Sequence, residues 1–411
     1  MPQPVNPRNK RNGRGPLLRF TRQRSLFLAF LLLISTPLLD TVFRVSRPVF
    51  IKENRRLASL PRFELRRPLD FLKRYEAYFN DHFGLRTQML RARNRLVLQW
   101  FHTSPSPKVI IGRQGWLFLA RGGATDNEID YYRNLTPFTR QELEAFKNTL
   151  EERRDWLARR GIRYLFMPAP GKSTIYPEFL PRAFNQLHAR SRLDQLVDYL
   201  SRHSSLRLLD LRPALLREKR HARIYHKTDT HWNDLGGYFA CREMIGRLRE
   251  YFPQMKPMPL DSFVVTQAST PGGDLAVMLS LQRDRFREMR VTVTPKVPFH
   301  ARPAAPTPGF KPWAPWVRVQ ASESPGGEIP AAVMVRDSFA QQLHPYLSEH
   351  FRRIVYIWDW ELRFYIPVIE KEKPWIVIDE MAERSLLNPV PVNPAELRRR
   401  PAAPPRELNP R

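Results

Sequence analysis

The stretch AAVMVRDSFA, residues 331–340, gives the clearest fold signal in this chain of 411 residues. Residues 331–335 are all apolar, which is typical of a strand buried on both faces of a sheet. Asp337 and Ser338 follow, just before a helix that we expect near 339–350. Ser338 is therefore either a helix-capping residue or an exposed nucleophile beside a helix amino terminus, whose N–H groups can stabilise an oxyanion.

Strands and helices alternate outward from this stretch. Further strands are expected at 163–168, 206–211, 223–226, 353–358 and 375–379, with two short strands around a turn in 108–120. Helices are expected over 68–84 and 85–101, from a capping box at Thr139 and Glu142 to Gly161, around 193–200, and over 234–251 and 361–372. The alternation predicts an α/β fold in which a mostly parallel sheet is covered by helices on both faces, with functional residues at the carboxyl ends of the strands.

The amino-terminal 43 residues predict a membrane anchor. Residues 1–24 carry seven basic residues and no acid, and residues 25–43 form an apolar run in which Asp40 is the single charged residue. At about 1.5 Å per residue this run just spans a hydrocarbon core of about 30 Å. The basic flank predicts a cytoplasmic amino terminus and a transmembrane helix over 25–43. A cleaved signal peptide and a buried core helix are the alternatives.

Composition narrows the class of protein. A hydrophobic content of 42% and a charged content of 26% exclude wholesale disorder and a polytopic membrane protein. The single cysteine, Cys241, excludes an intramolecular disulfide framework, a cysteine zinc cluster and an iron–sulfur site. Prolines concentrate in 301–330, which we expect to be a long surface loop, and in 389–411, a Pro/Arg-rich segment that we expect to be disordered.

A second loop with reactive groups is HKTDTHWND, residues 226–234, after the strand expected at 223–226. A serine nucleophile needs a base to take its proton and a carboxylate to fix the tautomer of that base. His231 and Asp229 offer both from one loop. The alternatives are a polar turn that caps the helix from Asn233 or Asp234, and a metal site built from His and Asp. No ligand-spaced cluster elsewhere in the sequence supports a metal.

A third loop is MPAPGKSTIYP, residues 167–177, after the strand at 163–168. Gly171 permits a tight turn. Lys172 is expected either to contact an anion in the site or to be solvated, and Ser173 is a competing nucleophile. No Gly-x-Ser-x-Gly pattern surrounds Ser173. Taken together, the three loops place a Ser, a His and an Asp at strand ends of one predicted sheet.

Four motifs together resemble the alginate O-acetyltransferase-like branch of the SGNH hydrolase superfamily. They are TDTHWN at 228–233, RDSF at 336–339, PAPGKSTIYP at 168–177 and GGDLAVML at 272–279. YFNDHFGLR at 78–86 and VIIGRQGWLF at 109–118 look like the lead-in segments of that family. The resemblance covers residues 65–385 and implies an SGNH hydrolase-like α/β/α domain that O-acetylates an exopolysaccharide of the alginate type or similar.

The resemblance also implies roles for residues. Ser338 corresponds to the nucleophile, His231 to the general base and Asp229 to its orienting partner, while Lys172 and Asp274 receive no role. The implied acetyl donor is a membrane-bound O-acyltransferase partner rather than a soluble cofactor, and the acceptor is a polysaccharide. No cofactor and no metal is expected. The implied location is the inner membrane, as a single-pass protein with its catalytic domain in the periplasm.

The sequence departs from the wider superfamily in two places. No Gly-x-Asn-Asp block for oxyanion donors is visible, and Arg336 stands where a Gly-Asp-Ser motif has its glycine. The backbone N–H of Ser338 is therefore the one oxyanion donor that we expect. A carbohydrate acetylesterase with the same triad and a non-catalytic polysaccharide-binding assembly protein are the alternative functions.

The net charge of +28 suggests an anionic partner. No basic helix interleaved with aromatic residues and no zinc-finger spacing appears, so nucleic acid is not expected. Residues 1–24 contribute +7 and residues 389–411 contribute +3, which leaves +18 on residues 25–388. We hypothesise that this remainder helps to hold an anionic polysaccharide or lipid headgroups. Salt-insensitive polymer binding would instead point to a genome that favours Arg.

Overall fold

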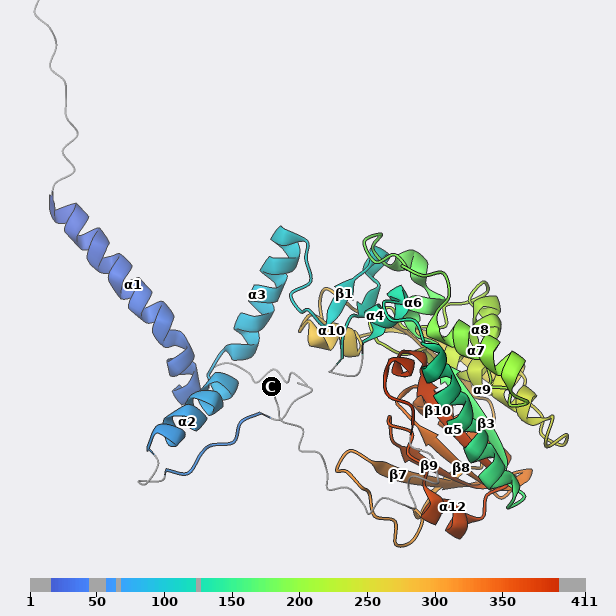
Figure 1. The fold of residues 1–411 in the computed structure, drawn as a ribbon. Coiled ribbons are helices and arrows are strands. Elements are labelled where there is room, and N and C mark those ends of the chain that lie inside the picture. Colours follow the sequence, from blue (N-terminus) through green and yellow to red (C-terminus); the bar gives the residue numbers. More distant parts are fainter. Residues whose placement is uncertain (1–15, 44–56, 64–67, 123–126, 392–411) are drawn as a thin grey trace, which may run out of the picture. The chain divides into compact units, whose positions relative to one another are not determined.

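The computed structural model describes residues 16–43, 57–63, 68–122 and 127–391 (Figure 1). The expectation of a disordered tail over 389–411 therefore lies, from residue 392 onward, outside the described residues. The chain divides into two compact units, Met1–Leu96 and Val97–Arg411, and each is described by itself.

The first unit contains the expected apolar helix. Helix α1 (Pro16–Phe43) includes a segment, Arg24–Phe43, that is long and apolar enough to cross a membrane, as a signal sequence also is. The two helices predicted after it are confirmed as α2 (Pro68–His82) and α3 (Arg86–Phe101), although α3 ends in the second unit.

Two side chains near the end of α1 accept hydrogen bonds from the turn between α2 and α3. Asp40 Oδ2 accepts a hydrogen bond from the backbone N–H of Leu85 at 3.0 Å, and Thr41 Oγ1 accepts one from Gly84 at 2.7 Å. A Cβ atom at Gly84 would lie 2.6 Å from the carbonyl oxygen of Pro37, so the approach of the two segments requires glycine there. The one charge in the apolar run therefore has a hydrogen-bond donor in this turn.

A six-stranded sheet forms the centre of the second unit (Figure 1). In spatial order its strands are β3 (Arg163–Ala169), β10 (Ile376–Ala382), β8 (Ile329–Arg336), β9 (Phe351–Trp358), β7 (Arg318–Glu323) and β6 (Arg302–Ala304). The first four run parallel to one another, β7 runs antiparallel to β9, and β6 runs antiparallel to β7. This confirms the predicted α/β fold with a mostly parallel sheet.

Helices cover both faces of this sheet, as predicted. On one face α5 (Arg140–Ala158), α7 (Arg192–His203) and α12 (Ile366–Glu372) pack on Phe166, Val333, Val355 and Val377. On the other face α9 (Asp234–Leu248), α8 (Arg212–Glu218) and α11 (His344–Leu347) pack on Met167, Met334, Ile354 and Ile378. Neighbouring residues of one strand enter opposite cores, which is why these strands are apolar without alternation. The predicted capping box of Thr139 and Glu142 begins α5.

Two predicted strands are wrong. Residues 206–211 belong to no strand, although the N–H of Leu209 donates to the carbonyl of Phe166 on β3. Residues 223–226 form a single bridge, Tyr225 to Trp232, in place of a strand. Both segments have strand-like composition, but strand formation depends on a partner along the whole length.

Three further expectations need correction. The helix expected near 339–350 is broken into the 3₁₀ turn Phe339–Gln342, helix α11 and the 3₁₀ turn Ser348–His350, because Pro345 has no N–H to donate. The helix expected over 361–372 begins only at Ile366. The surface loop expected over 301–330 contains β6 and β7, which extend the sheet at one edge.

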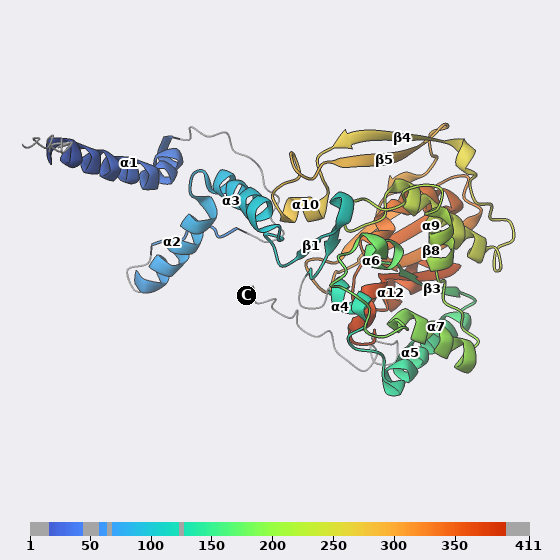
Figure 2. The ribbon, with the colours of Figure 1, turned by 90° about the horizontal axis from the view of Figure 1, so that it is seen from above.

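Two hairpins lie outside the central sheet (Figure 2). The predicted pair of short strands is confirmed as β1 (Val109–Ile111) and β2 (Leu117–Leu119). An antiparallel pair that the sequence did not predict joins β4 (Phe263–Thr270) to β5 (Glu288–Pro295). Helix α10 (Asp274–Met278) lies between β4 and β5 in the chain and packs on the first hairpin through a small apolar cluster. Two further short helices, α4 (Glu128–Arg133) and α6 (Lys172–Ile175), carry residues of the site.

Candidate active site

Ser338 lies two residues after β8, beyond the carboxyl end of the strand. Its Oγ lies 2.8 Å from Nε2 of His231. The neighbouring Asp337 does the capping, because its Oδ1 accepts from the N–H of Phe339 at 2.8 Å and its Oδ2 from Ala382 at 2.6 Å. The two roles that the sequence left open for the Asp-Ser pair are thus divided, and the Ser338 hydroxyl faces the histidine.

In the loop that carries His231, helix capping and hydrogen bonding within the site are likewise carried out by different residues. Asn233 caps α9, with its side chain accepting from the N–H of Gly236 at 2.9 Å. Asp229 Oδ1 accepts instead from Nδ1 of His231 at 2.8 Å and from the His231 backbone N–H at 3.1 Å. The structure therefore brings the three predicted residues into one hydrogen-bonded chain, Asp229–His231–Ser338.

Charge and hydrogen bonding fix the protonation of this chain. Burial would raise the pKa of Asp229, but the hydrogen bond and charge of His231 outweigh burial and lower that pKa. Burial would lower the pKa of His231, and Asp229 reverses this, so the pKa of His231 lies above its ordinary value. Because the carboxylate accepts from Nδ1, the proton of a neutral imidazole sits on Nδ1 and the Nε2 lone pair faces Ser338.

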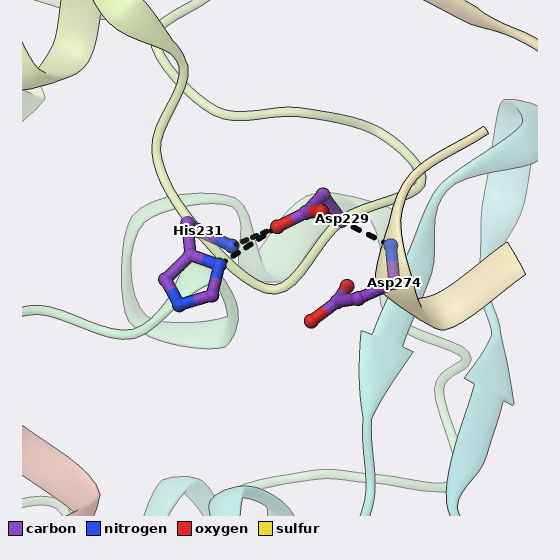
Figure 3. A group of neighbouring side chains, drawn as sticks. All are labelled: Asp229, His231 and Asp274. Carbon is purple, nitrogen blue, oxygen red and sulfur yellow. Dashed lines mark hydrogen bonds and ion pairs between the residues drawn. The ribbon is translucent and has the colours of Figure 1, made fainter. Parts of the chain in front are cut away.

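Asp274 supports the carboxylate of Asp229 from the opposite side (Figure 3). The backbone N–H of Asp274, in the first turn of α10, donates to Asp229 Oδ2 at 3.0 Å. The Asp274 carboxylate accepts from the N–H and the hydroxyl of Thr230 at 2.7 and 2.8 Å. A Cβ atom at Gly273 would lie 2.4 Å from Cβ of Asp229, so glycine is needed for this approach. The sequence singled out Asp274 without a role, and here it positions Asp229.

Among the residues that the structure describes, the same three form the one group whose spacing could suit a metal ion. Ligand atoms of Asp229, His231 and Asp274 lie within 4.8 Å of one another. All four carboxylate oxygens already accept hydrogen bonds from N–H or O–H groups, and Nδ1 of His231 is paired as well. A cation at this place would compete with every one of these bonds, so the donor set favours a hydrogen-bonded relay over a metal centre.

Lys172 neither contacts an anion nor is solvated, contrary to both expectations. Its side chain is buried, and Nζ donates to the backbone carbonyls of Asp229 at 2.6 Å and of His226 and Lys227 at 3.2 Å. Burial lowers the pKa of Lys172 to about 8, although Asp274, Asp229 and other acids act in the opposite direction. The ammonium group thus fixes the backbone of the loop that carries Asp229 and His231.

Ser173, the competing nucleophile, belongs to a different network. Its Oγ donates to Glu128 Oε1 at 2.7 Å, and the other carboxylate oxygen of Glu128 pairs with Arg384 at 3.3 Å. Glu383 accepts from the N–H of Gly171 at 2.7 Å in the same network. These acids come from segments that no motif marked, so sequence reasoning missed them. They hold the loop that presents Lys172.

Arg336, the departure from the Gly-Asp-Ser pattern, has a structural place. The buried guanidinium donates to the carbonyl of Asp337 at 3.0 Å and to the side chains of Gln320 and Gln341 at 3.3 and 3.2 Å. It therefore holds the turn that presents Ser338. Among the residues that the structure describes, the backbone N–H of Ser338 has no acceptor.

Part of the chain that forms this site matches a known protein family. Residues 109–306 match the family model described as the SGNH hydrolase-like domain of acetyltransferase AlgX. The matched range includes Asp229 and His231 and ends before Ser338. This match covers a little under half of the chain and confirms, for that part, the resemblance that the motifs indicated.

Curated relatives agree with this class. The chain is 28% identical over 211 residues to the probable alginate O-acetylase AlgJ of Pseudomonas aeruginosa, across 50% of each chain. It is 24% identical over 212 residues to the probable AlgJ of Pseudomonas syringae pv. tomato, across 51% of this chain and 50% of that protein. The chain thus spans about half the length of the curated relatives that it matches.

Among solved structures, PatB1 of Bacillus cereus is similar in fold. It aligns with a TM-score of 0.50 at 15% identity, covering 68% of this chain and 96% of PatB1. At this identity the match shows the shared fold alone.

Proposed function

We propose that the protein is an O-acetyltransferase that transfers acetyl groups to hydroxyls of an exopolysaccharide through an acetyl-serine intermediate. The observation that carries the proposal is the continuous hydrogen-bonded chain Asp229–His231–Ser338 at the carboxyl end of β8. The names of the relatives, probable alginate O-acetylases, support transfer of acetyl to a polysaccharide.

In the first half-reaction the Ser338 Oγ attacks the acetyl carbonyl carbon of the donor while His231 Nε2 takes the hydroxyl proton. The tetrahedral intermediate collapses, the bond to the donor oxygen breaks, and His231 returns the proton to that oxygen. The products are acetyl-Ser338 and the free donor alcohol. Asp229 stabilises the imidazolium that forms in between. The backbone N–H of Ser338 stabilises the oxyanion.

In the second half-reaction a sugar hydroxyl of the acceptor attacks the carbonyl carbon of acetyl-Ser338. His231 takes the proton of that hydroxyl, the bond from the acetyl carbon to Ser338 Oγ breaks, and the serine regains the proton. Attack by water in place of the sugar would give the acetylesterase. The acceptor therefore has to outcompete water at this step.

We further propose that the domain over 65–385 works outside the cytoplasm. The apolar segment Arg24–Phe43 and its basic flank support a single-pass anchor in the inner membrane, with residues 1–24 in the cytoplasm. In this arrangement an acetylated membrane-bound O-acyltransferase is the donor. An enzyme reporter fused after residue 60 is expected to be active only outside the cytoplasm, and cytoplasmic activity would contradict this topology.

The function is tested with purified protein, an acetylated chromogenic donor and an acceptor oligosaccharide. Transfer predicts that acceptor speeds donor release and becomes acetylated. Release that is indifferent to acceptor and yields no acetylated sugar would indicate an esterase. No release by the wild type, with polymer binding intact, would indicate a non-catalytic polysaccharide-binding protein.

A further inference from the structure

Helix α2, in the first unit, presents an apolar face to solvent. Leu69, Leu72, Tyr75 and Phe79 recur at helical spacing on this face, and all four side chains are exposed. Within the residues that the structure describes, no residue of α2 is buried. A helix in a protein gains most of its stability by packing such a face against a partner. The apolar face of α2 therefore calls for a partner.

The chain itself covers the other side of this helix. Residues 58–62 line a pocket together with Ala77, and the backbone N–H of Ala58 donates to Asp81 Oδ2 at 2.8 Å. At about 100° per residue, Ala77 points about 160° away from Phe79. The contact with residues 58–62 therefore lies opposite the apolar face and leaves that face uncovered.

The turn that follows α2 is attached to the end of the apolar span. Asp40 and Thr41, in the last turn of α1, accept hydrogen bonds from the backbone N–H groups of Leu85 and Gly84. In the proposed anchor Arg24–Phe43 crosses the bilayer, so Asp40 and Thr41 lie at the membrane surface where α1 ends. Helix α2 ends two residues before this turn, and its carboxyl end is therefore held at the same surface.

The composition of this region suits a lipid surface. Aromatic residues such as Tyr are enriched at the boundary between lipid and water, where one end of the side chain is apolar and the other is hydrated. Residues 44–96 contain 14 basic and 5 acidic residues, a net charge of +9. In the proposed topology this charge lies outside the cytoplasm, where the positive-inside bias does not account for it. An apolar helix face accompanied by basic residues is typical of helices that lie on anionic membranes.

We propose that α2 lies in the interface of the bilayer that α1 crosses, on the side where α1 ends. Leu69, Leu72, Tyr75 and Phe79 enter the boundary between headgroups and acyl chains, and anionic phospholipid headgroups surround the basic residues of 44–96. The partner of the apolar face is thus the lipid surface. The proposal rests on the proposed anchor and adds a second contact with the same bilayer. This contact moves the point at which the chain leaves the membrane from Phe43 to the start of α3.

The test is depth-dependent quenching of a fluorophore on the full chain, reconstituted in nanodiscs that contain phosphatidylglycerol. A thiol-reactive NBD label is attached to Leu72→Cys on the apolar face, to Ala77→Cys on the opposite side, or to Leu33→Cys in the middle of the span. Cys241 is buried, so the wild type reports background labelling. A helix in the interface lies about 5–10 Å deep, so lipids with a shallow nitroxide should lower the emission at position 72 at least about 2-fold and at position 77 by less than about a fifth.

Two double variants, both labelled at position 72, test whether the apolar face causes this quenching. Y75E/F79E places two carboxylates on the face. The matched control A77E/N80E adds the same charge at two exposed positions outside it. We expect Y75E/F79E to lose at least about half of the quenching and A77E/N80E to keep it, because burying a carboxylate in the interface is costly. Circular dichroism checks that both variants keep their helices.

An independent comparison tests the role of lipid charge. In nanodiscs of phosphatidylcholine alone, quenching at position 72 is expected to be weaker and to lose its dependence on salt. Equal quenching in both kinds of nanodisc would overturn the role assigned to anionic headgroups.

Position 33 separates this proposal from the anchor on which it rests. Deep nitroxide lipids are expected to quench the label there. If position 33 were quenched while positions 72 and 77 were not, or were quenched equally, the anchor would stand and the interfacial helix would be overturned. A membrane protein would then be the better partner for the apolar face. If position 72 were quenched and position 33 were not, the anchor would fail and the surface contact would stand.

Discussion

Two clusters of charged and polar groups use similar hydrogen bonds for different purposes. One lies within the central sheet, and the other lies beyond the carboxyl end of strand β8. At the centre, Asp379 of β10 accepts from Arg153 of α5 at 2.5 Å and from the hydroxyl of Tyr164 at 2.7 Å. Both charged side chains are fully buried. In the cluster beyond β8, Asp229 and His231 keep 24% and 19% of their side-chain surface exposed, and the cluster ends on the hydroxyl of Ser338.

The two aspartates also differ in the direction of their pKa shifts. Burial raises the pKa of Asp379 despite the opposing charge of Arg153. The pKa of Asp229 is lowered, because its hydrogen bond and charge interaction with His231 outweigh burial. A closed cluster contributes to the integrity of the sheet, whereas a cluster that is open at one end can pass a proton to a reactant. Variants in the two clusters should therefore separate stability from catalysis.

The largest effect is expected from Ser338→Ala. Loss of the nucleophile should lower donor turnover about 10⁴-fold or more while the melting temperature stays close to wild type. The rate is measured by release of a chromogenic acetyl ester. The control is Ser173→Ala, which removes the buried bond to Glu128 and should cost about 1–3 kcal/mol of stability with little loss of rate. If Ser173→Ala abolished turnover and Ser338→Ala did not, Ser173 and not Ser338 would be the nucleophile.

Asp229→Asn should lower turnover about 10³- to 10⁴-fold, because an amide does not hold the proton on Nδ1 of His231. Steady-state kinetics of donor hydrolysis measure this. Asp274→Asn is the matched comparison, since Asp274 bonds Thr230 and reaches Asp229 through its backbone N–H. A loss of about 10-fold is expected there. An equal loss in both variants would assign Asp274 a direct part in the relay.

Arg153→Met should act on stability. Removing the guanidinium leaves the carboxylate of Asp379 buried and unpaired, at a cost of about 3–5 kcal/mol in chemical denaturation. The double variant Arg153→Met with Asp379→Leu should recover much of this loss, because two apolar side chains replace the pair. Turnover per folded molecule should stay near wild type in both. A catalytic defect at full folding would show that the central cluster is not purely structural.

Lys172→Met should lower kcat about 10-fold, since the loop that carries Asp229 and His231 loses its three hydrogen bonds to the ammonium group. KM for the donor should change less than kcat if Lys172 positions the base. Lys219→Met is the control, because Lys219 also donates to a backbone carbonyl, that of Ile175, away from this loop. Equal effects in both variants would mean a general loss of packing.

The smallest effect expected is a displacement of the pH profile. His231 acts as a base only when neutral, and its pKa is raised above its ordinary value of 6.5 by Asp229. Donor turnover should therefore fall as the pH drops through a value above 6.5, and the residual turnover of Asp229→Asn should persist to lower pH. If the fall of turnover at low pH occurred at the same pH in Asp229→Asn as in the wild type, the titrating group would not be His231 paired with Asp229.

The sequence predicted the parts of the fold that are decided locally. Strands β8 and β10 lie between two helical layers, and their continuous apolar runs at 331–335 and 376–378 identify them. Strand β7 buries only Ala321 and owes its place to pairing with β9. Because β7 lies in the proline-rich segment 301–330 and has little apolar content, its sequence resembled that of a loop. Residues 206–211 show the reverse case, with strand-like composition and no partner along their length.

In the candidate site, too, the sequence predicted the residues that stand in local motifs and missed those that depend on tertiary packing. Ser338, His231 and Asp229 stand in motifs that were all singled out from the sequence, although the strand expected before Asp229 and His231 is a single bridge. Their catalytic roles remain a proposal. Glu128, Glu383 and Glu288, which brace the surrounding loops, come from unmarked segments and acquire their partners only through tertiary packing.

The most direct test of the account is to locate the acetyl group on the enzyme. Wild-type protein is mixed with acetyl donor in the absence of polysaccharide, quenched in acid, digested and analysed by mass spectrometry. The account predicts one acetyl group on Ser338, absent in Ser338→Ala and discharged when acceptor is added before the quench. Continued turnover with acetyl on another residue, or on none, would contradict it.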